Sequence, residues 1–195
     1  MTESPARGKG RGARERVLVA ATTLFQRHGI NATTMEQVAA AAPVSKRTLY
    51  AHFPAKDDLM VGYLRHLSES GATLEAMLDR TDLSPREQLR WLFTIPDGTN
   101  APIRGCPFTD AAAEFPDPES PVHRYALERK RRFPQQLAEL AARLGAVDPE
   151  ALGEQLAILA DGAAGRAMVL NDGACMRYGL MAAEALVDAQ SRRPE

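Results

Sequence analysis

Residues 33–59 read TTMEQVAAAAPVSKRTLYAHFPAKDDL, and this stretch decides the fold. Thr34 and Gln37 have the spacing of a capping box, in which two side chains satisfy free backbone groups at the start of a helix. Pro43 ends that helix, because the residue before a proline is disfavoured in the α region. Ser45 is a favourable N-cap for a second helix, from Lys46 to about His52. The stretch therefore predicts two short helices joined by a tight turn.

Two short helices joined in this way form a helix-turn-helix, whose second helix enters the major groove of DNA. Leu49 and Phe53 are four residues apart, so both can pack inward from one face of the second helix. The other side chains of this helix are left for solvent or nucleic acid: Lys46, Arg47, Thr48, Tyr50 and His52.

The order Val-Ser-x-x-Thr-Leu-Tyr-x-His-Phe-x-x-Lys over residues 44–56 resembles the TetR family of bacterial transcriptional regulators. The resemblance covers roughly residues 12–60, and beyond them only the architecture is similar. In the family the turn usually reads Ala-Gly-Val-Ser, whereas here proline occupies the glycine position. Because proline holds φ at about −65°, we expect the turn to avoid positive φ at Pro43.

Charge is unevenly distributed along the chain. The net charge is −1, but residues 1–56 contain nine Lys/Arg and three Asp/Glu, whereas residues 57–195 contain fifteen and twenty-two. A basic N-terminal part on an acidic remainder indicates that the first part meets a polyanion. The alternative is a polarised, solvated surface.

Hydrophobic periodicity predicts an all-α fold: an N-terminal three-helix helix-turn-helix head and a larger C-terminal helical bundle, about nine helices in all. We expect a mobile basic arm over residues 1–12, a DNA-binding domain over 13–55, and a ligand-binding and dimerisation domain over 56–195. The first helix is expected over 13–28, with His28 on its buried stripe. A single connecting helix is expected over 56–79, spanning about 35 Å. The basic run at 129–132 is expected to be a solvated face.

Two apolar helices are expected at the end of the chain, over about 149–170 and 174–190. Their apolar positions recur every three or four residues with many alanines, which suits close helix packing. The pair looks like half of a four-helix dimer interface, as in the TetR family, and the alternative is ordinary core within one chain. The expected interface residues are Leu152, Leu156, Leu159, Ala163, Ala167, Leu170, Met176, Leu180, Ala183 and Val187.

The resemblance implies a repressor that binds a palindromic operator in double-stranded DNA as a homodimer. By position, Lys46 and Arg47 are the expected contacts to base edges, and Thr48 is expected to touch a base or a thymine methyl group. Phosphate contacts are expected from Thr34, Tyr50, His52 and Lys56. Thr34 has a second interpretation as a helix cap alone, and Tyr50 and His52 as surface packing.

The resemblance also implies a small-molecule inducer that binds the C-terminal domain and releases DNA. The apolar candidates for its site, each of which has plain core packing as an alternative, are Trp91, Phe93, Phe108, Phe115, Tyr125, Phe133 and Met168. Together they favour a mostly apolar ligand, whose identity the sequence does not specify.

Cys106 supports an alternative function, a thiol-gated or redox-gated regulator. It follows Arg104 and precedes a short helix over 107–115, and both features favour a thiolate. An inert thiol is the other interpretation. A Cys106–His123 nucleophile–base pair would suggest an enzyme, but no acid partner, phosphate loop or metal-ligand spacing accompanies it. We therefore expect no enzyme activity, metal or cofactor.

Two cysteines do not form a disulfide framework, which fits a reducing cytoplasm. No apolar run reaches the roughly 18 residues of a membrane span, and the N-terminus does not read as a signal peptide.

Overall fold

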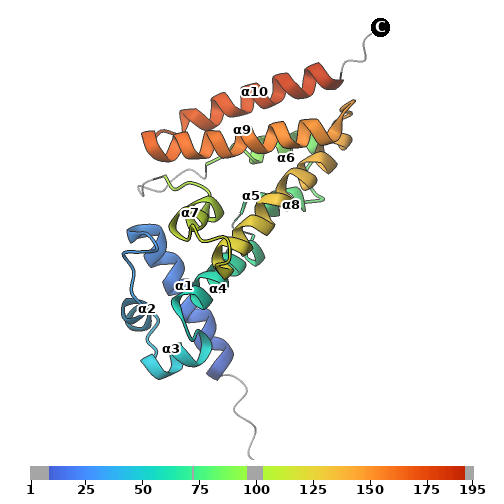
Figure 1. The fold of residues 1–195 in the computed structure, drawn as a ribbon. Coiled ribbons are helices and arrows are strands. Elements are labelled where there is room, and N and C mark those ends of the chain that lie inside the picture. Colours follow the sequence, from blue (N-terminus) through green and yellow to red (C-terminus); the bar gives the residue numbers. More distant parts are fainter. Residues whose placement is uncertain (1–8, 72, 96–102, 192–195) are drawn as a thin grey trace, which may run out of the picture.

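The computed structural model describes residues 9–71, 73–95 and 103–191, and these residues form ten α-helices and no β-strand (Figure 1). The predicted all-α fold is confirmed. The helices are α1 (Lys9–His28), α2 (Met35–Ala41), α3 (Lys46–His52), α4 (Lys56–Glu69), α5 (Leu74–Leu78), α6 (Pro85–Trp91), α7 (Pro107–Glu114), α8 (Pro121–Arg143), α9 (Pro149–Leu170) and α10 (Ala174–Ser191).

The long helix α1 begins at Lys9, four residues before the predicted start. The last part of the predicted arm is therefore helical, and residues 1–8 lie outside the described residues. His28 is exposed, so the expectation that it belongs to the core is wrong. It is the last residue of α1, where the stripe that packs against α2 and α4 has already ended at Phe25.

Both predicted caps of the helix-turn-helix are confirmed. The Thr34 hydroxyl accepts a hydrogen bond from the Gln37 N–H at 3.2 Å, and the Gln37 side-chain oxygen accepts one from the Thr34 N–H at 2.8 Å. The Ser45 hydroxyl accepts one from the Thr48 N–H at 3.1 Å. These bonds satisfy N–H groups that have no partner inside the helices, and so they fix where α2 and α3 begin.

The turn between α2 and α3 differs from the prediction, because Pro43 has a φ of +23°. The Val44 N–H donates to the Ala39 carbonyl at 3.1 Å, which is the longer bond of a Schellman motif. This motif needs a left-handed residue just after the helix, and Pro43 occupies that position. The expectation that the turn avoids positive φ is therefore wrong: the turn keeps the geometry that glycine would give, and proline is strained within it.

The predicted single helix over 56–79 is two helices. α4 ends at Glu69 and α5 begins at Leu74, with Gly71 between them at a φ of +75°. A left-handed residue cannot continue a right-handed helix, so the chain changes direction there. α4 is thus about 21 Å long and not 35 Å. This break accounts for ten helices where about nine were expected.

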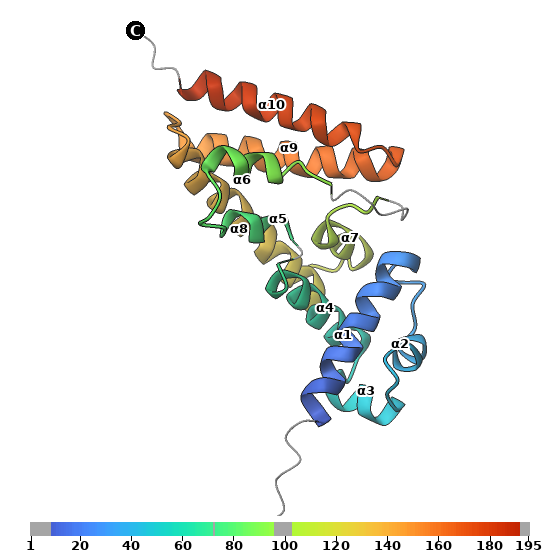
Figure 2. The ribbon, with the colours of Figure 1, turned by 180° about the vertical axis from the view of Figure 1, so that it is seen from behind.

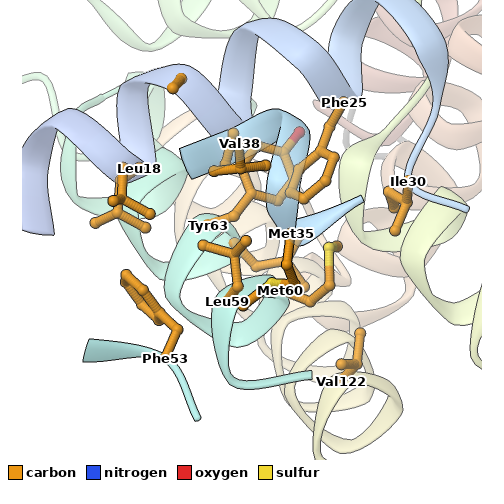
Figure 3. Packing of buried hydrophobic residues seen from close by; sticks show 14 of the residues in the cluster. Leu18, Phe25, Ile30, Met35, Val38, Phe53, Leu59, Met60, Tyr63 and Val122 are labelled. Carbon is orange, nitrogen blue, oxygen red and sulfur yellow. The ribbon is translucent and has the colours of Figure 1, made fainter. Parts of the chain in front are cut away.

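The buried side chains of the described residues form two clusters. The first joins α1–α4 to α7 and to the start of α8 (Figure 3), with Phe25 and Tyr63 in edge-to-face contact at 5.1 Å between ring centroids. Phe108 of α7 and Val122 of α8 belong to it. The head therefore shares a core with part of the C-terminal domain. Because this core is close-packed, a shift of α7 or α8 would displace α4.

The second cluster joins α5, α6, α8, α9 and α10. α9 and α10 run antiparallel at the end of the molecule opposite α2 and α3 (Figures 1 and 2). α8 packs chiefly on α9, and Gly153 makes their close approach possible. A Cβ atom there would lie 2.6 Å from the Pro134 carbonyl oxygen and 2.7 Å from the Ala138 nitrogen.

Candidate nucleic-acid interface and ligand cavity

Helix α3 lies at one end of the molecule with one face buried and the other outward (Figure 1). Leu49 and Phe53 are buried in the head, as predicted. Lys46, Arg47 and Tyr50 are exposed, and Thr48 and His52 are half-buried. The outward face has the length and chemistry of a helix that reads a major groove.

The two residues expected to contact bases differ in their surroundings. The Lys46 ammonium lies 3.0 Å from Glu36 and lowers the pKa of that carboxyl. Arg47 is exposed and makes no hydrogen bond or ion pair with the described residues. Its guanidinium is therefore free to donate to a guanine edge, whereas Lys46 must first leave Glu36.

The residues expected to contact phosphate are placed around α3. Thr34 caps α2, so its capping role is present. Lys56, at the start of α4, reaches the Asn31 carbonyl at 3.5 Å, which places it beside the loop before α2. Tyr50 is 43% exposed, and the His52 ring lies 6.5 Å from the Phe53 ring. The fold thus gathers the starts of α2, α3 and α4 in the head.

A cavity of about 780 Å³ lies between the C-terminal end of α1 and the helices of the C-terminal domain. Of the predicted ligand residues, Trp91, Phe108 and Phe133 line it. Tyr125 lines a separate, polar cavity of about 310 Å³. Phe93, Phe115 and Met168 are not among the described residues that line either one. The larger cavity falls within the size of small-molecule sites, about 300–1,000 Å³.

The charged residues Glu75, Lys130 and Asp161 line the larger cavity, and each of them forms an ion pair. Lys130 pairs with Asp161, and Glu75 pairs with Arg129 at 3.0 Å. Arg129 and Lys130 are half-buried, so the expectation that residues 129–132 form a solvated face is wrong for two of the four. Both lie near aromatic rings, which favours cations in a sheltered position.

Helix α7 connects the cavity to the head. Arg104, which precedes α7 and lines the cavity, donates to the Gln26 carbonyl at 2.6 Å and to the Arg27 carbonyl at 3.0 Å. At the other end of α7, Glu114 accepts a hydrogen bond from the Asn31 N–H at 2.8 Å. Sequence reasoning missed both links, because each joins residues about 80 positions apart and no local pattern marks them.

Cys106 is the N-cap residue of α7, is half-buried, and lines the cavity. Burial lowers the pKa of Lys130, but Cys106 and Asp161 together raise it above its ordinary value. Cys106 and Lys130 both line the cavity. His123 is engaged elsewhere, with Nδ1 2.8 Å from the Phe115 carbonyl oxygen.

The predicted dimer residues are placed mainly inside the single chain. Seven of the ten are buried in the second cluster, which corrects the expectation that they face a partner: Leu152, Leu156, Ala163, Ala167, Met176, Ala183 and Val187. Leu159 and Leu180 are half-buried, and Leu170 is 54% exposed. These side chains hold α9 and α10 against each other and against α6 and α8.

A different face of α9 and α10 is exposed and apolar. Its large side chains are Ile158 (69% exposed), Val169 (78%), Leu170 (54%), Tyr178 (70%) and Met181 (64%), hereafter the outer face. Both helices are apolar nearly all round, so periodicity could not tell which side meets the rest of the chain.

Within the described ranges, no helix has the length and apolar character to cross a membrane. The same residues contain no group of three or more His, Cys, Asp or Glu placed to hold a metal ion.

Comparison with known proteins agrees with this geometry. Residues 17–62 match the family of bacterial regulatory proteins named tetR. The crystal structure of a TetR-family transcriptional regulator from Streptomyces coelicolor is 34% identical, with a TM-score of 0.79 over 93% of this chain and 97% of that one. The chain therefore belongs to the TetR family, whose members are non-enzymatic DNA-binding transcriptional regulators.

Two curated relatives are also similar. The HTH-type transcriptional regulator YjdC of Escherichia coli K12 is 29% identical over 159 residues, which cover 80% of this chain and 83% of YjdC. The HTH-type transcriptional repressor KstR2 of Rhodococcus jostii RHA1 is 38% identical over 96 residues, 40% of this chain and 47% of KstR2.

Proposed function

We propose that the chain is a repressor that binds a palindromic operator as a homodimer and is released by a small, mostly apolar inducer. The observation that carries the proposal is the placement of two unpartnered surfaces at opposite ends: the outward side of α3 and the outer face of α9 and α10. A dimer through the outer face leaves both α3 helices free for DNA. Because its proposed target is an operator in bacterial DNA, we propose that the protein acts in the cytoplasm.

Two glycines support the outer face as the dimer surface. Gly162 and Gly165 lie in α9 between Ile158 and Val169, and a Cβ atom at either one would meet nothing within 4 Å among the residues that the structure describes. Glycine inside a helix costs about 1 kcal/mol relative to alanine, and no close contact with the described residues of the same chain requires glycine at these positions. A partner helix that approaches closely at these positions supplies one.

The dimer is tested by the Ile158→Glu variant in sedimentation equilibrium. We expect a dimer for the unmodified chain and a monomer for the variant, because a charge on the outer face would be buried without a partner. Leu127→Glu is the control, since Leu127 is 39% exposed on α8, away from the outer face. A monomeric unmodified chain at high concentration contradicts the proposal.

The DNA contact is tested by selecting bound fragments from the source genome and titrating salt. We expect a palindromic site and an affinity that falls steeply with salt. Arg47→Ala should cost roughly 1–3 kcal/mol and relax specificity at one base position. The control is Arg131→Ala, which removes an equal charge from an exposed position on α8. Equal losses for both variants would show that Arg47 reads no base.

The cavity is the proposed inducer site. It is bounded both by the end of α1 and by the C-terminal helices, so a ligand inside it touches the head and the dimerisation domain at once. A change in the position of α7 reaches the head through Arg104 and Glu114. Release of DNA then requires only that the ligand bind one arrangement of these elements better than the other.

Thiol gating at Cys106 is the second candidate, and the position of the thiol favours it, because Cys106 lines the cavity at the start of α7, the helix that is linked to the head. Cys106→Ser should then abolish the release of DNA by peroxide, whereas Cys175→Ser should not. If peroxide releases DNA equally from both variants, Cys106 is not the sensor.

A further inference from the structure

Arg104 connects the cavity and the head, because its side chain lines the cavity while it binds the last turn of α1. Its partners there, the Gln26 and Arg27 oxygens, are among the last four carbonyls of a helix, which have no partner inside it. Arg104 supplies the missing donors. No carboxylate of the described residues forms an ion pair with Arg104, although its charge interacts with that of Asp110 over a longer distance.

The fixed charges of the cavity wall are unbalanced at this end. Among the described residues, two carboxylates line the cavity, and both are already paired, Glu75 with Arg129 and Asp161 with Lys130. Arg104 and Arg27, both exposed and both beside the end of α1, form no ion pair with the described residues, and Asp110, whose charge interacts with that of Arg104, is not among the described residues that line the cavity. An anionic group is therefore favoured at the α1 end, whereas the part of the wall contributed by the end of α6 and the start of α10, with Trp91, Ile95 and Met176, is apolar.

A second polar group of the wall lacks a partner. Thr73 lines the cavity, is only 8% exposed, and its hydroxyl makes no hydrogen bond with the described residues. A buried hydroxyl without a partner costs free energy. A ligand with a hydrogen-bonding group along its length would remove that cost.

We propose that the cavity binds an amphipathic carboxylic acid, whose carboxylate pairs with Arg104 and whose apolar body extends toward Trp91. Guanidinium and carboxylate form two parallel, charge-assisted hydrogen bonds, which are stronger than bonds to neutral carbonyls. The ligand therefore takes Arg104 from the Gln26 and Arg27 oxygens. The end of α1 loses its cap and gains a nearby negative charge, which its own dipole opposes. The effect of this ligand on DNA binding rests on the proposed function, whereas its binding to the cavity does not.

Binding is measured without DNA, by the fluorescence of Trp91, the single tryptophan, and by calorimetry. The probes are decanoate, decanol and decylamine, which share one apolar chain and differ in head group. We expect decanoate to bind at least about tenfold more tightly than decanol, and decylamine to bind most weakly. In Arg104→Gln, decanoate and decanol should bind alike. Arg131→Gln, which changes an exposed arginine of α8, should keep the preference.

Two results would overturn the proposal: equal binding of decanoate and decanol by the unmodified chain, or a preference for decanoate that survives in Arg104→Gln. If that surviving preference is lost in Lys130→Gln, the anchor is Lys130. Thermal melts of each variant confirm that it is folded. DNA binding is assayed separately, so a protein that binds DNA but not decanoate refutes only this inference.

Discussion

Replacing Pro43 with glycine should stabilise the protein. Pro43 has a φ of +23°, at the position of a Schellman motif where glycine is common. A proline also lacks the N–H that this motif directs to the carbonyl two residues inside the helix end, here that of Ala40. Glycine relieves the strain and restores the donor, without changing any side-chain contact of α3.

The expected gain follows from three contributions. Relief of a strained backbone conformation contributes about 1–3 kcal/mol. A restored backbone hydrogen bond contributes about 1 kcal/mol. The greater freedom of glycine in the unfolded chain offsets about 1 kcal/mol. The free energy of unfolding should therefore rise by about 1–3 kcal/mol, which for a chain of this size corresponds to a higher Tm by about 5 °C.

The assay is urea denaturation followed by circular dichroism, supported by thermal melts. Ala40→Gly is the matched control, since Ala40 is exposed in the interior of α2 and glycine there should cost about 1 kcal/mol. If Pro43→Gly is no more stable than the unmodified chain, or loses stability as Ala40→Gly does, Pro43 is not strained in the turn.

Three further substitutions test the packing and electrostatics. Gly153→Ala should lower the free energy of unfolding by more than 2 kcal/mol in urea titrations, roughly the cost of overpacking against backbone that cannot move cheaply. Gln88→Leu should cost about 1–3 kcal/mol in the same assay, because the buried Gln88 amide donates to two carbonyls at the end of α5. Burial and repulsion by Glu114 raise the pKa of Asp110 above 3.8, so its ionised form destabilises the fold at neutral pH and that cost fades as pH falls through the raised pKa. Asp110→Asn should thus raise stability at pH 7, with a gain that shrinks on acidification in melts across pH; a pH-independent gain would contradict this cause.

The local signals of the sequence predicted the head well. Caps, prolines and short periodic runs act within a few residues, so the bounds of α2 and α3 followed from Thr34, Pro43 and Ser45 directly. The predictions for Pro43 and Gly71 are wrong because each relies on one local signal, whereas the surrounding structure also determines the backbone conformation. Pro43 was expected to prevent positive φ, but the packing of α2 against α3 holds the turn. Gly71 was read as part of a helix and instead ends it.

The C-terminal domain was predicted less completely, for two physical reasons. An apolar stripe marks burial but not the identity of the covering surface, so Leu156 was assigned to a partner when its own chain covers it. The links of Arg104 and Glu114 to the head join distant positions, and no spacing rule predicts them. Of the predicted ligand residues, Trp91 and Phe133 line the cavity because their helices converge there.

In the proposed complex, two chains joined through the outer faces of α9 and α10 place two α3 helices on one DNA duplex. The most direct measurement is native mass spectrometry of the protein mixed with its selected operator duplex. We expect two chains per duplex, and loss of that species in Ile158→Glu but not in Leu127→Glu. A complex that contains one chain per duplex at saturating protein would contradict it.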